Sequence, residues 1–444
     1  LENANSTVEV GDGATGIYSK DGNVDLKAGS KLTIGKTLGK NQEAVGLYHT
    51  GTAAGTINNN LSSLTIGTGS IGLVVAGSGA TTLNNNMSNI NLRGDAVYTY
   101  TSNTRSTVHG RTKITSTGDG NYGYYVAGNL TNYAGTGNMD FSSGTGNVGI
   151  YSSYSTGNAV ARNYANINVG KTDLERELYS IGMAAGYTNK DNPSQNRIGH
   201  VINEGTITVG NENSIGMYAS GLGSTATNNA GHTINLSGDG SMGMYLDNGA
   251  KGVNDGTITT VNADGGSIGV IGIKDSQFTN NGTISVNEGS VGIYGNGNNA
   301  VLKNKGVIAA GRNSVGMYST NGANIENNKT IKLTGDNAVG MYLAENSKGI
   351  NNGEIITEGI VNKAVGVAIG KNAEFTNNGK IVMNSNEGSG IVIANGGIIK
   401  NYGNIQITGE NSSREKRVDN IIVKIEGITS TLSSTRTTAS SLGI

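Results

Sequence analysis

Residues 280–303 read NNGTISVNEGSVGIYGNGNNAVLK, and residues 304–326 repeat the same pattern as NKGVIAAGRNSVGMYSTNGANIE. Both segments open with an Asn-x-Gly turn, carry an apolar-Gly-apolar-Tyr motif near the middle, and close with a short run after an Asn-Ala or Gly-Ala pair. Glycine and asparagine adopt positive φ at low cost, so they suit tight corners. Each segment therefore predicts three short β-strands joined by turns.

The repeat extends through most of the chain, with steps of about 23 to 27 residues between Gly216 and Gly390. A regular period of this length is typical of a solenoid, and three strands per period indicate a parallel β-helix. We therefore predict an all-β fold, a right-handed parallel β-helix of about 15 coils with a period of about 24–26 residues, over residues 1–410. The pattern fades over residues 411–444, which we expect to form a degenerate C-terminal coil, a cap or a linker.

Strand periodicity assigns side chains to two faces. Successive residues of a strand point to opposite sides of a sheet. In VGMY at 315–318 we thus expect Val315 and Met317 to face the interior. Gly316 and Tyr318 are expected to face outward. The asparagine that opens each turn keeps one phase, and we expect these amides to stack into a hydrogen-bonded ladder. The predicted ladder comprises Asn254, Asn280, Asn304, Asn327, Asn351, Asn377 and Asn401.

The composition excludes several other classes of protein. The 444 residues include 72 glycines but one proline, without glycine at every third position, which excludes collagen. A formal net charge of −1 leaves no polybasic surface for nucleic acid. The chain has no cysteine, and its histidines lie in separate coils without metal-ligand spacing, so we expect no metal and no cofactor. The histidines are His49, His109, His200 and His232.

The period is broken at one place, near residues 171–200. Two segments exceed the repeat length, KTDLERELYS at 171–180 and YTNKDNPSQNR at 187–197. Insertions in a solenoid project as surface loops and often form a binding face. We therefore expect ligand contacts from these loops, with ligand-free surface loops as the alternative. The candidate ligand-binding residues are Arg176, Tyr187, Lys190, Asp191 and Arg197.

The tyrosines of the repeat share one phase and are expected to form a column. Such a column either binds sugar rings or stacks on itself at a corner. The residues that replace tyrosine at this phase in other coils are never charged, which favours structural stacking over a solvated binding strip. The column comprises Tyr18, Tyr48, Tyr151, Tyr218, Tyr245, Tyr294, Tyr318 and Tyr342.

The tripeptide Arg93-Gly94-Asp95 matches an integrin-binding sequence. The surrounding NLRGD at 91–95 has the same phase as NLSGD at 235–239 and KLTGD at 332–336. Gly-Asp is therefore a recurrent feature of the repeat, and only the arginine is new. We expect an ordinary turn at this position.

Units of the form NNGTI…GS(I/V)G(M/I)Y…GA resemble the passenger repeats of large fusobacterial type V (classical) autotransporter adhesins, the RadD-like group. The resemblance covers most of residues 1–410 and is clearest over 200–405. It implies a signal peptide upstream and an outer-membrane β-barrel downstream. We therefore expect this chain to be a passenger portion, attached to the membrane only through a missing C-terminal β-barrel. It also implies an extracellular position at the cell surface and binding to host cells or other bacteria.

We therefore expect a monomeric, non-catalytic adhesin segment whose partner is a glycan or protein on a host-cell or bacterial surface. One alternative is a passive spacer, with adhesion located elsewhere in the full protein. The other is a β-helical polysaccharide-active enzyme. Glycoside hydrolysis requires two carboxyl groups about 5 to 10 Å apart. Acidic residues are sparse here and do not recur as pairs in adjacent coils outside the Gly-Asp turns, so catalysis is not expected.

Overall fold

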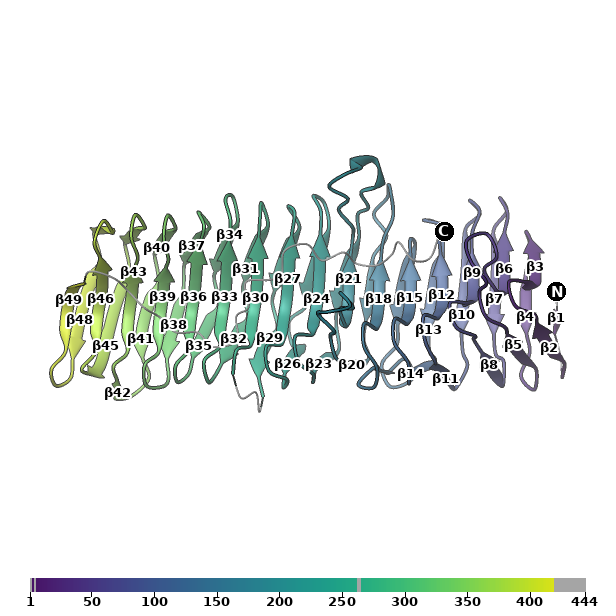
Figure 1. Ribbon diagram of the computed structural model, residues 1–444, viewed down its shortest axis with the longest axis horizontal. Coiled ribbons are helices and arrows are strands. Elements are labelled where there is room, and N and C mark those ends of the chain that lie inside the picture. The colour runs from purple at the N-terminus through teal and green to yellow at the C-terminus, as the bar shows by residue number, and fades with distance from the viewer. Residues whose placement is uncertain (1, 4, 262–264, 419–444) are drawn as a thin grey trace. The chain divides into compact units, whose positions relative to one another are not determined.

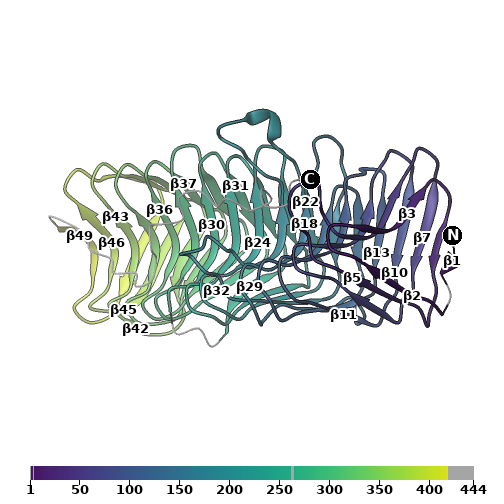
Figure 2. The same cartoon turned by 45° about the vertical axis from the view of Figure 1, so that its right-hand side comes forward.

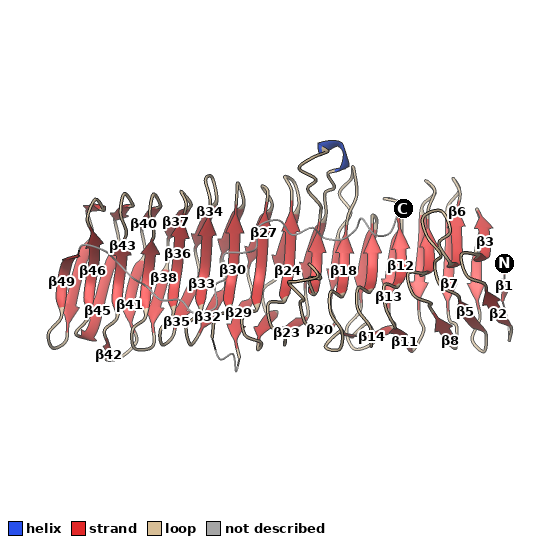
Figure 3. Cartoon of the chain, viewed as in Figure 1, coloured by secondary structure: helices blue, strands red, loops and turns tan. Residues whose placement is uncertain are grey.

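The computed structural model describes residues 2–3, 5–261 and 265–418 of the chain. The described residues fall into two units, which meet in sequence between Ala226 and Thr227, and each unit is described by itself. Both are built from short strands that pair in parallel, one coil apart. The described part of the chain contains a single helical element, the 3-10 turn η1 (Pro193–Gln195), blue in Figure 3. No helix in it has the length and apolarity to cross a membrane.

Each coil contributes one strand to each of three sheets, here called sheets 1, 2 and 3. In one coil of unit 2, β34 (Val301–Asn304) lies in sheet 1, β35 (Val307–Ala310) in sheet 2 and β36 (Val315–Thr320) in sheet 3. The Asn-Gly corner joins sheet 1 to sheet 2, a second corner joins sheet 2 to sheet 3, and a third leads to the next coil. Within each unit, equivalent strands of successive coils lie side by side (Figures 1 and 2).

The strands of unit 1 follow this order through the chain, and β25 (Thr225–Asn228) contains the boundary between the units. Sheet 1 contains β1 (Glu2–Asn3), β4 (Val24–Leu26), β7 (Gly55–Asn59), β10 (Thr81–Asn85), β13 (Thr107–Gly110), β16 (Asn129–Asn132), β19 (Ala161–Asn163) and β22 (His200–Asn203). Sheet 2 is hydrogen-bonded in two parts. The first is β2 (Thr7–Val10), β5 (Lys31–Ile34) and β8 (Ser63–Thr65), and the second begins with β11 (Asn89–Leu92), β14 (Lys113–Ser116), β17 (Met139–Asp140), β20 (Asn166–Val169) and β23 (Thr206–Val209). Sheet 3 contains β3 (Thr15–Lys20), β6 (Val45–Thr50), β9 (Ile71–Val75), β12 (Val97–Thr101), β15 (Tyr122–Val126), β18 (Val148–Ser152), β21 (Ile181–Ala185) and β24 (Ile215–Ser220).

Unit 2 repeats the arrangement, with one short additional strand, β42 (Val361–Asn362), that pairs with β45. Its other sheet 1 strands are β28 (Lys251–Asn254), β31 (Gln277–Asn280), β37 (Asn324–Asn327), β40 (Lys348–Asn351), β44 (Glu374–Asn377) and β47 (Ile398–Asn401). Its other sheet 2 strands are β26 (Thr233–Leu236), β29 (Thr257–Thr260), β32 (Thr283–Val286), β38 (Thr330–Leu333), β41 (Glu354–Thr357), β45 (Lys380–Asn386) and β48 (Asn404–Thr408). Its other sheet 3 strands are β27 (Met242–Asp247), β30 (Ile268–Ile273), β33 (Val291–Asn296), β39 (Val339–Leu343), β43 (Val365–Ile369), β46 (Ser389–Ala394) and β49 (Ser413–Val418).

The predicted fold is confirmed: the chain is an all-β, right-handed parallel β-helix. Among the described residues, sheet 3 has eight strands in each unit, so the chain forms about 16 coils against the predicted 15. β49 pairs with β46, which extends the coil pattern past residue 410 to Val418. The remainder of the segment expected to be a coil, cap or linker, residues 419–444, lies outside the described residues.

A ladder of buried amides fixes the register of the coils. In unit 2, Nδ2 of each ladder asparagine donates a hydrogen bond to Oδ1 of the next, at 2.8 Å in every step from Asn254 to Asn401. The side chains from Asn254 to Asn377 are fully buried. The predicted ladder is therefore confirmed. Because a buried amide without a partner costs about 1–3 kcal/mol, a coil that slips in register is strongly disfavoured.

The glycine of the apolar-Gly-apolar-Tyr motif faces inward. In the pairing of β33 with β36, Val315 and Met317 have partners in the register, but Gly316 between them has none. A Cβ atom on Gly316 would lie 2.8 Å from Cγ2 of the buried Ile331. The inward positions predicted for Val315 and Met317 are confirmed by their full burial, and Tyr318 is partly exposed. The outward position predicted for the glycine is wrong, because a local irregularity in the strand, like that of a β-bulge, breaks the alternation.

One coil fills this inward position with a large side chain. Tyr98 in β12 replaces the glycine, and its ring is fully buried. Its hydroxyl group lies 2.9 Å from Oγ1 of Thr112 and accepts a hydrogen bond from Nδ2 of Asn59 at 3.2 Å. In the next coil the ladder position is Gly110, and a Cβ atom there would lie 2.7 Å from the hydroxyl oxygen of Tyr124. Aromatic rings thus fill the interior where the regular columns are interrupted.

The ladder predicts that the loss of stability on substituting an asparagine depends on its position in the ladder. Asn304→Ala leaves Nδ2 of Asn280 and Oδ1 of Asn327 without their buried partners. We expect this variant to lower the free energy of unfolding by about 2–4 kcal/mol. Asn401→Ala, at an exposed ladder position, should cost less than about 1 kcal/mol. Urea denaturation followed by circular dichroism measures both, and equal losses would contradict a stabilising role of the buried ladder.

The inward glycine column makes a second prediction. A Cβ atom on Gly72 would lie 2.6 Å from the carbonyl oxygen of Tyr98 and 2.9 Å from Cδ1 of Ile66, whereas one on Gly11 would have no heavy atom within 4 Å. Gly72→Ala should therefore lower the free energy of unfolding by about 1–3 kcal/mol through overpacking. Gly11→Ala should leave it within about 0.5 kcal/mol of the wild type. A Gly72→Ala protein as stable as the Gly11→Ala control would show that the interior has room.

Candidate functional site

The two insertions leave the coils at opposite ends of β21. Residues 171–180 join β20 to β21 at the corner between sheets 2 and 3, and residues 186–199 join β21 to β22 at the corner between sheets 3 and 1. The second insertion carries η1 and projects beyond the neighbouring turns (Figures 1 and 2). The five predicted contact residues are therefore divided, with Arg176 at one corner and the other four at another.

Arg176 is held against the coils by two carboxylates. Its Nε atom lies 2.6 Å from Oδ2 of Asp173, and its Nη2 atom lies 3.0 Å from Oδ2 of Asp119. The hydrogen bonds from Arg176 hold the pKa of Asp173 below its usual range, and the Asp173 carboxylate raises the pKa of Arg176. Arg176 therefore clamps this insertion onto the coils with two of its five N–H donors.

The second insertion is a hairpin that its own side chains stabilise. Tyr187 and Arg197 exchange both backbone hydrogen bonds, at 3.0 and 2.9 Å. Oδ1 of Asn189 accepts hydrogen bonds from two backbone N–H groups of the loop, including that of Asp191, each at 3.0 Å. Lys190 and Asp191 are exposed at the tip. The loop thus satisfies much of its backbone with its own groups, although its tip is surrounded by solvent.

The base of the hairpin packs onto the coils. Ile198 and Tyr154 exchange backbone hydrogen bonds at 2.8 Å in both directions. Burial raises the pKa of Tyr100 in the adjacent sheet 3 to about 12. Of the predicted contact residues, Lys190 and Asp191 are the two most available to a partner.

The tyrosines of sheet 3 contact one another in successive coils, as the structural interpretation predicts. The ring centroids of Tyr318 and Tyr342 lie 4.8 Å apart with their planes 23° apart. Two members of the column were missed from the sequence, Tyr100 and Tyr125, whose rings lie 5.1 Å apart. Tyr100 lacks the preceding Gly-x pattern because Tyr98 replaces the glycine.

The Arg93-Gly94-Asp95 tripeptide forms a turn between β11 and β12, as predicted. Gly94 has a φ of 150° and Asp95 a φ of 46°. The backbone N–H of Asp95 donates a hydrogen bond to the carbonyl oxygen of Asp119 in the next coil, at 2.7 Å. The tripeptide therefore follows the corner conformation of the repeat.

Three of the histidines have polar side-chain partners in unit 1. Nδ1 of His49 lies 3.2 Å from Oγ of Ser19, and Nδ1 of His200 lies 2.8 Å from Oγ1 of Thr225. Nδ1 of His109 lies 3.0 Å from the hydroxyl of Tyr133. Burial lowers the pKa of each of these histidines, because it disfavours the charged imidazolium. Within the described ranges, no three His, Cys, Asp or Glu residues are grouped to hold a metal ion.

Acid is therefore expected to destabilise unit 1. The unfolded chain takes up a proton at His49 near pH 6.5, whereas the folded chain resists protonation, so stability is greatest above that pH and is lost as the pH falls below it. His49→Asn keeps a side-chain amide near Ser19 but removes the titration. Thermal denaturation between about pH 7 and 5 should show a smaller fall in Tm for this variant than for the wild type. The same fall in both proteins would exclude His49 as a contributor.

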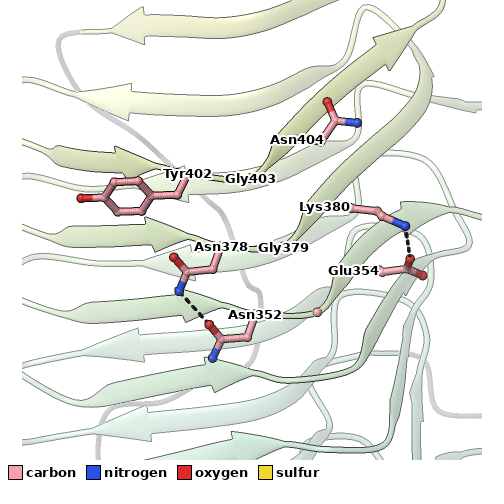
Figure 4. A pocket seen from close by; sticks show the side chains of 9 residues that line it. Asn352, Glu354, Asn378, Gly379, Lys380, Tyr402, Gly403 and Asn404 are labelled. Atoms are coloured by element: carbon pink, nitrogen blue, oxygen red, sulfur yellow. Dashed lines mark hydrogen bonds and ion pairs between the residues drawn. The ribbon is translucent and has the colours of Figure 1, made fainter.

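Unit 2 carries a polar groove along its Asn-Gly corner (Figure 4). Three consecutive coils line it with equivalent triplets, 352–354, 378–380 and 402–404, around a volume of about 590 Å³. A Cβ atom on Gly379 or Gly403 would lie 2.0 Å from the carbonyl oxygen of the glycine one coil before, so the floor of the groove must be bare backbone. The two walls are formed by Asn352, Asn378 and Tyr402 on one side, and by Glu354, Lys380 and Asn404 on the other (Figure 4).

The walls of this groove combine amides, one ion pair and one aromatic ring. Nδ2 of Asn378 donates a hydrogen bond to Oδ1 of Asn352 at 2.8 Å. Nζ of Lys380 lies 3.2 Å from Oε1 of Glu354. The Tyr402 side chain is 74% exposed. The Asn-Gly turns were predicted from the sequence, but the groove was not, because it forms only when three coils are stacked.

A second polar groove, of about 350 Å³, lies in unit 1 over sheet 2. β17, which contributes to its lining, has two residues where the neighbouring β14, β20 and β23 have four. Beside the groove, the guanidinium carbon of Arg111 lies 4.0 Å from the centre of the Tyr133 ring. The groove is lined by Lys113, Asn138, Met139, Asp140, Asn166, Asn168, Thr206 and Thr208.

Comparison with known proteins agrees with the parallel β-helix. A family model described as the BigA third pectate lyase-like domain matches the chain three times, over residues 2–231, 227–330 and 309–423. Together these matches cover nearly all of the described residues. The chain matches no curated protein and no solved structure.

Proposed function

Because the chain belongs to the family of the BigA third pectate lyase-like domain, we propose that it is a non-catalytic adhesive segment at a bacterial cell surface. The coils serve as a support, and the 186–199 hairpin contacts a glycan or protein on host cells or other bacteria. The proposed setting is a monomeric passenger of a RadD-like type V autotransporter of fusobacterial type. In that setting the chain is extracellular and is anchored to the outer membrane through another part of the full protein.

The ordered hairpin is the observation that carries this proposal. Many charges on the coils are paired with a charge one coil away, such as Lys332 with Glu358 at 3.2 Å. Within the described ranges, no ion pair engages Lys190 or Asp191 at the hairpin tip. An ordered loop also loses less conformational entropy on binding than a flexible one. The tip therefore combines available charge with a fixed shape.

The two grooves support a non-catalytic assignment over a polysaccharide-active enzyme. Two carboxyl groups are needed to cleave a glycosidic bond by the usual mechanisms. The unit 2 groove has one carboxylate in its lining, Glu354, which is paired with Lys380. The unit 1 groove has Asp140, which accepts a hydrogen bond from the hydroxyl of Ser142 at 2.6 Å. Neither lining therefore contains the two carboxyl groups that would act as general acid and as nucleophile or base.

Adhesion by the hairpin is tested with fluorescently labelled protein on host cells and on other bacteria. Replacing residues 189–196 by Gly-Gly keeps the Tyr187–Arg197 pairing but removes the tip. We expect cell binding to fall about tenfold or more, and Lys190→Ala with Asp191→Ala to lower it several-fold.

The matched control is Lys332→Ala with Glu358→Ala, which removes two exposed charges from the coils and should leave cell binding unchanged. Equal thermal stability of all variants establishes that they are folded. Full binding by the tip-deleted protein would favour the passive spacer. Failure of the wild type to bind any cell would contradict an adhesive role for this segment.

A further inference from the structure

The groove of unit 2 has a lysine in place of the floor glycine in the coil before it, and an aromatic ring at its other end. In the coil before the groove, Lys329 occupies the position that Gly353 and Gly379 hold in the floor, and its side chain interrupts the glycine column. At the other end, Tyr402 takes the position held by asparagine in the two preceding coils (Figure 4). The lining of the groove thus spans three coils along the corner.

The groove offers hydrogen bonds without net charge. Each asparagine amide both donates and accepts hydrogen bonds. Lys380 and Glu354 neutralise one another across 3.2 Å, so the lining does not select a strongly charged ligand. A protein partner usually buries an apolar centre in its interface, and the lining contains no aliphatic side chain. An extended polar ligand with one apolar face fits this lining better.

A related arrangement occurs in unit 1. Tyr164 is 37% exposed and precedes the groove residue Asn166 by two positions, as Tyr402 precedes Asn404 in unit 2. The unit 1 groove also contains one cation and one anion, Lys113 and Asp140. In each unit, therefore, an exposed tyrosine directly follows a ladder-position asparagine near a polar groove.

We propose that the groove of unit 2 binds a neutral, extended oligosaccharide. A sugar ring carries hydroxyl groups around its edge and C–H bonds on its faces. The ring of Tyr402 stacks on one such face, while the amides of Asn378 and Asn404 bond to hydroxyl groups. This inference rests on the proposed adhesive function and deepens it, because it names a glycan as the ligand class and a site apart from the hairpin.

The test uses the complete chain and two groups of probes. Neutral probes are maltohexaose, cellohexaose, chitohexaose and galactohexaose, and the acidic probe is hexagalacturonate. Isothermal titration should detect at least one neutral probe with a Kd below about 1 mM, and weaker binding of the acidic probe. Tyr402→Ala should raise that Kd about tenfold, and Tyr402→Phe should leave it nearly unchanged because the ring is retained.

Tyr18→Ala is the matched control, since Tyr18 is 63% exposed on sheet 3 and lies outside the groove. It should not alter the Kd. Absence of binding to every neutral probe, or equal weakening by Tyr18→Ala and Tyr402→Ala, would overturn the inference. Hairpin-dependent cell binding, together with no neutral probe bound in a Tyr402-dependent way, would leave the adhesive function intact and refute the groove inference. Tyr402-dependent sugar binding without any cell binding would support the groove inference and contradict the adhesive function.

Discussion

In unit 2 the ladder amide of each coil must meet the amide of the next, and this requirement sets the alignment of the other residues in the repeat. Once Asn304 is bonded to Asn327 at 2.8 Å, the apolar positions of the following strands are also in register. The valine and methionine of each motif then stack in the interior. The glycines fall into columns for the same reason. Extra residues are accommodated at corners, because the strands between corners have a fixed phase.

Repetition explains how much of the fold could be predicted from the sequence. Many copies of one unit reveal the period, the three strands and the ladder, because an error in one copy is corrected by the others. The orientation of Gly316 could not be obtained in the same way, since alternation assumes a regular strand. The near-constancy of glycine at this position was the available signal. A residue that tolerates no Cβ atom faces something close, and here it faces the buried Ile331.

The candidate sites were predicted less completely, because they depend on contacts between coils. The insertions were visible as breaks in the period, but the carboxylate of Asp119 that engages Arg176 lies far away in the sequence. The grooves are formed by equivalent residues of successive coils, three in unit 2 and four in unit 1. The replacement of asparagine by Tyr402 in NYG was the one local signal. By itself, however, this replacement predicts only another turn.

The amide ladder of unit 2 also has a direction. Every Nδ2 group from Asn254 to Asn377 donates toward the coil that follows it in sequence, so the side-chain dipoles point the same way and reinforce one another. A coil that is already folded therefore presents an oriented donor to the segment that comes after it. It also presents an oriented acceptor to the segment that comes before it, so each layer selects the register of both of its neighbours. A chain with this property orders itself progressively and needs no long-range search between distant segments.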